Sequence, residues 1–243
     1  MKSIKNKSAL TGLAAVVFSM LAGTAHAQKV TVTVQNLTHG SHFTPLLVAA
    51  HDANTHLFKA GEAASASLQA MAEGGDISGL VSDLGATNAA VVTNPAGGLL
   101  APGKRTTTTV INTDGTDNHY LSLVAMVLPS NDGFVGVNGW PIPTEPGTYM
   151  LPGLAYDAGT EANNELLGAA NAGAPGNAGV PGAPSGSAGT GGTGAAGADT
   201  NQTVHVHRGI LGDTNATGGV SDLDSRVHRW LNPVARIVVK VGQ

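Results

Sequence analysis

The sequence predicts a mostly β fold: an antiparallel β-sandwich with one or two short helices and a Gly/Ala-rich insertion. Residues 29–35 and 234–241 alternate apolar with polar side chains, which is typical of strands with one buried face. Residues 120–128 form a near-continuous apolar run, which suits a central, buried strand. Because the first and last of these segments are both strands, they favour a sandwich whose terminal strands lie in its sheets.

Shorter segments complete the predicted sheets. The Thr-rich residues 104–112 and the alternating residues 203–207 have good β-propensity. Between residues 51 and 75 the pattern changes, because apolar side chains such as Leu68 and Met71 recur at helical spacing. We expect one or two short helices there, ending at the Gly74–Gly75 pair.

Residues 168–200 are almost wholly Gly, Ala, Pro, Ser, Thr and Asn. Such a segment buries too little apolar area to offset the entropy of ordering it. It also lacks the strict glycine period of collagen. We therefore expect a flexible Gly/Ala/Pro-rich insertion at about residues 164–201, within one β-sandwich domain.

The N-terminus predicts export. Three lysines precede an apolar stretch at residues 10–22, and Ala25-His26-Ala27 follows with the pattern that signal peptidase requires. Residues 1–27 are therefore predicted to be a signal peptide, and residues 28–243 the mature domain. No later apolar stretch is long enough for an integral membrane segment. The expected location is secreted or periplasmic.

Charge and cysteine content exclude several classes of function. Without residues 1–27 the chain has nine Lys and Arg against 16 Asp and Glu, a formal charge of −7. This balance argues against nucleic acid as a partner and against electrostatic docking on anionic lipid. The chain has no cysteine, which excludes disulfides, thiolate zinc sites and cysteine nucleophiles.

Two acidic loops are the strongest candidate site. Asp132 lies in a turn-rich loop directly after the apolar run, and Asp157 and Glu161 flank a second loop that contains Gly159. Ca²⁺ takes six to eight oxygen ligands, which carboxylates on such loops can supply. Each loop alone is weak evidence, since most aspartates in turns cap their own backbone.

Four motifs in order resemble the spondin N-terminal (F-spondin) domain family. Residues 50–75 resemble a stretch of that family, and residues 126–138 (MVLPSNDGFVGVN) are similar to its M-V-x-P-S-x-D-W-x-V-G-V-D motif. Residues 156–161 (YDAGTE) resemble its Y-D-A-G-T-D signature, and residues 232–237 (NPVARI) are similar to its last strand. The resemblance implies a C2-like antiparallel β-sandwich that binds Ca²⁺ through Asp132, Asp157 and Glu161.

The sequence departs from the family pattern at three of these positions. Glu161 stands where the family has Asp, Gly133 where it has Trp, and Asn138 where it has Asp. Glu161 keeps the charge but reaches one methylene further. The cysteines and thrombospondin repeats of animal members are missing, so animal matrix and integrin-type partners are not carried over.

Histidines offer a second constellation. His205 and His207 are two residues apart on an expected strand, so their rings would share a face and could hold Zn²⁺ or Cu²⁺ with a third ligand. Two histidines on an exposed strand are also common without any metal. His51 is expected to be a structural hydrogen-bonding residue. No nucleophile or phosphate-loop motif stands in a suitable context.

The sequence thus predicts an exported, non-catalytic, Ca²⁺-binding adhesion or recognition module, with an unknown extracellular protein or glycan as its ligand. The alternative is a periplasmic zinc- or copper-binding protein, or a metal-dependent enzyme, that uses His205 and His207. A third possibility is a purely structural secreted protein in which calcium is incidental.

Overall fold

The computed structural model describes residues 28–174, 177–186, 189–197 and 201–242. The predicted signal peptide, residues 1–27, lies outside the described residues. Within the described ranges, no helix is long and apolar enough to cross a membrane.

Two short helices and a set of antiparallel strands make up the regular structure of the described residues. The helices are α1 (Ala66–Gly74) and α2 (Ser78–Gly85). The strands are β1 (Lys29–Asn36), β2 (His42–Phe43), β3 (Leu47–His51), β4 (Ala90–Thr93), β5 (Arg105–Thr107), β6 (Ile111–Asn112), β7 (Tyr120–Leu128), β8 (Gly133–Pro141), β9 (Gly147–Asp157), β10 (His205–Val206) and β11 (Ala235–Gly242).

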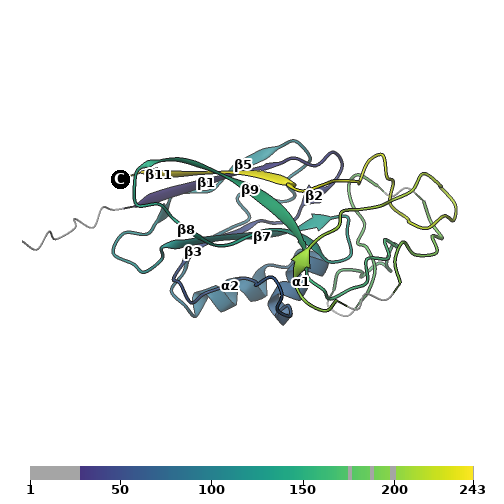
Figure 1. Ribbon diagram of the computed structural model, residues 1–243, viewed down its shortest axis with the longest axis horizontal. Helices are drawn as coiled ribbons and strands as arrows, with labels where there is room; N and C mark the ends of the chain where they lie inside the picture. The colour runs from purple at the N-terminus through teal and green to yellow at the C-terminus, as the bar shows by residue number, and fades with distance from the viewer. Residues whose placement is uncertain (1–27, 175–176, 187–188, 198–200, 243) are drawn as a thin grey trace, which may run out of the picture.

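The strands form two layers that share β9. Hydrogen-bonded neighbours follow the order β4-β3-β7-β8-β9-β11-β1-β5. The first part of β9 pairs with β11, and its last residues, from Leu154 to Asp157, pair with β8. Figure 1 shows β9 crossing from the β11–β1 layer to the β7–β8 layer. The predicted antiparallel β-sandwich with few helices is therefore confirmed.

The core between the two layers comes from the alternation seen in the sequence. Val30, Val32 and Val34 of β1 are fully buried, while the polar residues between them are half-exposed. These valines face the second layer across the core. In that layer every residue of β7 except Tyr120 is buried. Each such side chain contributes about 1.5–3 kcal/mol of transfer free energy to folding.

The helices cover the other face of the β3–β7–β8 layer (Figure 1). Helix α1 begins where the Ser65 side chain accepts a hydrogen bond from the Leu68 amide, and it ends at Gly75, whose φ is 75°. Its residues Leu68 and Met71 are buried against β7 and β8 in a second apolar cluster. The predicted helix end at Gly74–Gly75 is thereby confirmed for α1, whereas α2 lies beyond the predicted range. Strand β7 is central because it is covered on both faces.

The outer face of the β9–β11–β1–β5 layer has no covering element in the described part of the chain (Figure 1). Its side chains are the outward half of the alternation in β1 and β11, which is polar except for Val238. The two terminal strands run side by side along their whole length, with Lys29 opposite Gly242 and Asn36 opposite Ala235.

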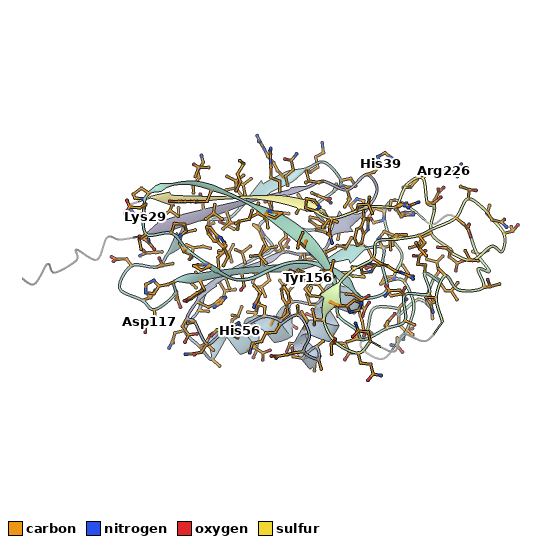
Figure 2. All side chains as sticks on the ribbon, viewed as in Figure 1. Lys29, His39, His56, Asp117, Tyr156 and Arg226 are labelled. Carbon is orange, nitrogen blue, oxygen red and sulfur yellow. The ribbon has the colours of Figure 1, made fainter. Side chains whose placement is uncertain are left out.

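Between β9 and β11 the chain is mostly loop, and it lies at the end of the sandwich opposite the labelled Lys29 (Figures 1 and 2). The strand predicted at residues 203–207 is limited to the two residues of β10. Described parts of the Gly/Ala-rich segment bond to one another, as in the bridge between Leu167 and Val180, and Val180 is buried. The flexibility expected of this insertion stays a prediction.

Candidate functional site

Asp132 lies in the tight connection between β7 and β8. Ser130 shapes this loop, because its hydroxyl donates to the Val127 carbonyl at 2.7 Å and accepts from the Gly133 amide at 3.0 Å. Asp132 is fully buried beneath the turn. A carboxylate at such a position has no water to satisfy it, so its partners must come from other loops.

Asp157 is the last residue of β9 and is the register partner of Gly133. The pairing of β8 with β9 therefore places Asp157 beside Asp132 at one end of the sandwich. The labelled Tyr156 marks this end of β9 in Figure 2, far from Lys29. Asp157 is also buried, so the structure brings two of the three predicted acidic ligands together.

Loop amides and the side chains of Thr160 and Asn163 hold the two carboxylates in place. Oδ2 of Asp132 accepts hydrogen bonds from the Thr160 amide at 2.7 Å and the Glu161 amide at 3.1 Å. Oδ1 of Asp157 accepts from the Gly159 amide at 2.8 Å, and its Oδ2 accepts from the Asn163 side chain at 2.5 Å. The loop 158–163 thus wraps both aspartates, with Gly159 at a φ of 71°.

One carboxylate oxygen of this acidic pair has no hydrogen-bond partner. Oδ1 of Asp132 is buried and makes no hydrogen bond. Burial, followed by the neighbouring charge of Asp157, raises the pKa of Asp132 to about 7, against the opposing effect of the Thr160 and Glu161 hydrogen bonds. The site therefore favours either a proton or a cation at Asp132.

Glu161 points towards a different set of partners. Its Oε2 accepts from the Asn131 side chain and from the Gly179 amide, each at 3.1 Å. Burial is the main cause that raises the pKa of Glu161. Among the described residues, no group of three or more histidine, aspartate or glutamate side chains is placed to hold a metal ion. Metal binding by Asp132, Asp157 and Glu161 stays a prediction.

His205 and His207 lie at the same end of the sandwich. Nε2 of His205 is 3.7 Å from Oδ2 of Asp157, and its Nδ1 bonds the Thr203 carbonyl at 2.8 Å. Nδ1 of His207 accepts from the Gly209 amide at 2.9 Å, so the proton of the neutral ring is on Nε2, which is buried without a partner. Burial lowers the pKa of His207 to about 4.

His207 and Ser130 occupy the space beside Gly133, the position at which the family motif has tryptophan. A side chain on Gly133 would meet Nε2 of His207 at 3.1 Å. The imidazole, tilted against Trp230 with ring centroids 5.0 Å apart, reaches this position from a distant part of the chain, and the Ser130 hydroxyl lies closer still, at 2.8 Å. No local signal in residues 126–138 could have predicted this contact with His207.

Two serine–histidine pairs have structural roles. Nε2 of His51 is 2.7 Å from the Ser122 hydroxyl, but both residues are buried in the sheet, so no substrate can reach them. Nδ1 of His228 accepts from the Asp224 amide, which leaves its Nε2 protonated and unable to act as a base toward Ser185, 3.1 Å away. His51 thus has the structural role expected from the sequence.

Three residues that the sequence did not single out organise the loops. Asn131 bonds both Glu161 and the amide of Glu165, and Asn163 bonds Asp157. Glu165 is buried and accepts hydrogen bonds from the Leu211 and Gly212 amides, at 2.8 Å each, and from the hydroxyl of Ser221 at 2.7 Å. Glu165 thereby ties the chain after β9 to the chain before β11.

The fold and the paired loops define a β-sandwich module with a buried acidic pair at one end. The family model Spondin_N matches residues 24–165, more than half of the chain, and the chain therefore belongs to the Spondin_N family. This is a family of extracellular, non-enzymatic domains. The match includes Asp132, Asp157 and Glu161 but ends before His205, His207 and β11. No curated protein matches the chain.

Proposed function

We propose that this chain is an exported, non-catalytic recognition module whose loop end is braced by Ca²⁺. The ion would bind at Asp132 and Asp157, with Glu161 as the third acidic ligand. The observation that carries the proposal is the buried Oδ1 of Asp132, which has no hydrogen-bond partner and lies beside a second buried carboxylate. A divalent cation would remove the repulsion between these two groups.

The donor set suits a hard cation. Two carboxylates and neighbouring main-chain and amide oxygens are the ligands that Ca²⁺ takes, and water can complete the shell. Glu161 would have to turn away from Asn131 and Gly179 to join them. Because the loop 158–163 already bonds both aspartates, a bound ion would stabilise the end of the sandwich rather than create it.

The test is thermal unfolding of the protein with calcium and with chelator. At a calcium concentration about a hundred times Kd, binding adds about 2.7 kcal/mol, or roughly 5–10 °C in Tm for a domain of this size. Asp157→Asn should abolish this increase. Asp114→Asn, an exposed aspartate outside both loops, is the matched control and should retain it.

Unchanged stability with and without calcium would refute the proposal and favour a purely structural role. A second candidate rests on His205, whose Nδ1 donates to the Thr203 carbonyl and whose Nε2 therefore carries a lone pair, 3.7 Å from Oδ2 of Asp157. His207 would have to give up the hydrogen bond from the Gly209 amide to supply a second free nitrogen. Imidazole nitrogens suit Zn²⁺ or Cu²⁺ better than Ca²⁺. Stoichiometric zinc or copper in the purified protein, lost on His205→Ala, would establish that candidate in place of the first.

A further inference from the structure

Basic side chains gather on the one sheet face that the described chain leaves uncovered. In β1 the residues that point outward are Lys29, Thr31, Thr33 and Gln35, because the valines between them point inward. The register continues this pattern across the layer, since Thr31 is opposite Lys240 and Lys240 is opposite Thr148. We call this surface the basic face; its cations are Lys29, Arg105, Arg236 and Lys240.

These four cations have no counter-ion in the described part of the chain. None lies within 4.0 Å of a carboxylate, whereas Lys59, Arg208 and Arg226, on loops elsewhere, each do. The strands β1, β5 and β11 contain no acidic residue at all. Four of the nine Lys and Arg residues after residue 27 therefore share one face of an otherwise acidic domain.

One end of the basic face is hollowed. A shallow depression of about 450 Å³ is lined by Lys29 and Lys240 together with Thr31, Thr148 and neighbouring backbone. Two ammonium groups and two hydroxyls are donors for an anionic oxygen. The depression lies at the first residues of β9, and Asp157 is the last residue of the same strand. It is thus separate from the acidic pair.

The second pair of cations is Arg236 of β11 and Arg105 of β5, further along the same face. Arg236 precedes Lys240 by four residues of β11, a separation of about 13 Å for an extended strand. Arg105 lies across Gln35 from Arg236. Between the two cation pairs lie the hydroxyls of Thr33 and Thr107, 2.8 Å apart, together with the apolar side chains of Val238 and Met150, which are opposite each other in the register. The face therefore presents cations at intervals, with hydroxyl groups and apolar side chains between them.

We propose that the basic face binds an acidic polysaccharide, a chain of sugars that carries carboxylate or sulfate groups at intervals. The lysine-lined depression would take one acidic group and the Arg236–Arg105 end another, while the threonine hydroxyls bond sugar hydroxyls between them. A net charge of −7 after residue 27 argues against nucleic acid, which needs a far larger basic excess. Anionic lipid is disfavoured because four cations are at the low end of a lipid-binding cluster.

This inference rests on the proposed recognition role but not on the metal, and the experiment separates the two. Binding to alginate and to dextran sulfate is measured with calcium and with chelator, and neutral dextran serves as the blank. We expect binding in both conditions at low salt, and strong weakening at about 0.3 M salt because exposed charges are screened. Glycan binding by a protein whose Tm does not respond to calcium would refute the metal proposal alone. A Tm that rises with calcium in a protein that binds neither polysaccharide would refute the glycan proposal alone.

Two double variants with the same change in net charge test the location. Arg236→Gln with Lys240→Gln should weaken binding about tenfold or more, equivalent to 1.4 kcal/mol. Lys59→Gln with Arg226→Gln removes two exposed cations from loops elsewhere and should leave the affinity within about twofold. Thr31→Val with Thr148→Val keeps the β-branched shape and should weaken binding through the lost hydroxyls.

Three results would overturn the proposal. The first is an equal loss of binding in both double variants, which would mean that only net charge matters. The second is binding to phosphatidylglycerol vesicles but not to either polysaccharide, which would make the face a membrane-docking surface. The third is no binding to either polysaccharide at low salt by a protein whose thermal unfolding shows that it is folded.

Discussion

The carbonyl oxygen of Gly173 occupies the space that a side chain on Gly74 would need. Gly74 is the last residue of α1, and Gly173 belongs to the Gly/Ala-rich segment 99 residues later in the chain. The absence of a side chain on Gly74 thus permits backbone-to-backbone contact between the helical layer and this segment. Glycine is required at Gly74 because of what packs on it.

Gly74→Ala should therefore detach the segment around Gly173 or strain α1. We expect the free energy of unfolding to fall by about 1–3 kcal/mol, the usual cost of overpacking. Gly85→Ala is the matched control, because Gly85 also ends a helix but has nothing within 4 Å of an added side chain. That change should be neutral or should stabilise by about 0.5–1 kcal/mol. Urea unfolding measures both, and equal effects would contradict the contact.

Glu165 should be the most sensitive residue of the loop region. Its buried carboxylate joins two amides, the Ser221 hydroxyl and, at 3.8 Å, the Arg208 guanidinium. Glu165→Ala leaves these donors buried without a partner and should cost about 3–5 kcal/mol. Glu62→Ala removes an exposed glutamate paired with Lys59 at 3.8 Å and should cost less than about 1 kcal/mol.

Thermal unfolding and protease cleavage of residues 164–234 would both report the loss of Glu165. Because the loops are bonded to the Glu165 carboxylate, a protease should cut Glu165→Ala first within these loops, before the sandwich unfolds. Simultaneous loss of all structure, with no early cleavage in the loops, would show that Glu165 does not act on the loops alone.

The raised pKa of Asp132 predicts an unusual pH dependence in chelator. The pKa of Asp132 is about 7 in the folded state against an ordinary value of 3.8, so between these pH values the folded state binds more protons than the unfolded state. The contribution of Asp132 to stability should therefore grow as the pH falls from about 8 to about 5 and be lost as the pH rises through 7.

Asp132→Asn isolates this effect, because the remaining groups titrate alike in both proteins. The Tm of the wild type minus that of Asp132→Asn should increase on acidification in chelator. Saturating calcium should reduce this slope, since a bound cation would keep Asp132 ionised. A difference independent of pH in chelator would contradict the burial of an unpaired carboxylate.

Two methionines differ in burial between the helical layer and the uncovered sheet face. Met71 of α1 is fully buried, whereas Met150 of β9 is 72% exposed on the basic face. Met71→Ala should lower the free energy of unfolding by about 2–5 kcal/mol, through lost apolar burial and the cavity that remains. Met150→Ala should change it by less than about 0.5 kcal/mol. Denaturant unfolding of the two variants checks both values.

The elements that the sequence predicts well are those with a local cause. The valine–threonine alternation of β1 follows from a period of two, and the apolar run of β7 follows from cover on both faces. The acidic loops of Asp132 and Asp157 could also be recognised locally. Their meeting depends on the register of β8 with β9, which the family motifs indicate and residue spacing does not.

What sequence reasoning missed depends on distant partners. The expected strand at residues 203–207 is limited to His205 and Val206, and His207 packs over Gly133, far earlier in the chain. The hydrogen bonds of Glu165 come from residues 46 to 56 positions later, which no window of sequence contains. The basic face likewise arises only when β11 is laid between β1 and β9.

The pairing of β1 with β11 also determines how the domain would respond to tension. Lys29 and Gly242 are opposite each other, so a force that pulls them apart acts across the two strands and along their hydrogen bonds. Those bonds would break one pair at a time from this end, as a zipper opens, instead of resisting together in shear. A module tethered through residues 29 and 242 would yield at low load, and the depression between Lys29 and Lys240 would be the first surface to come apart.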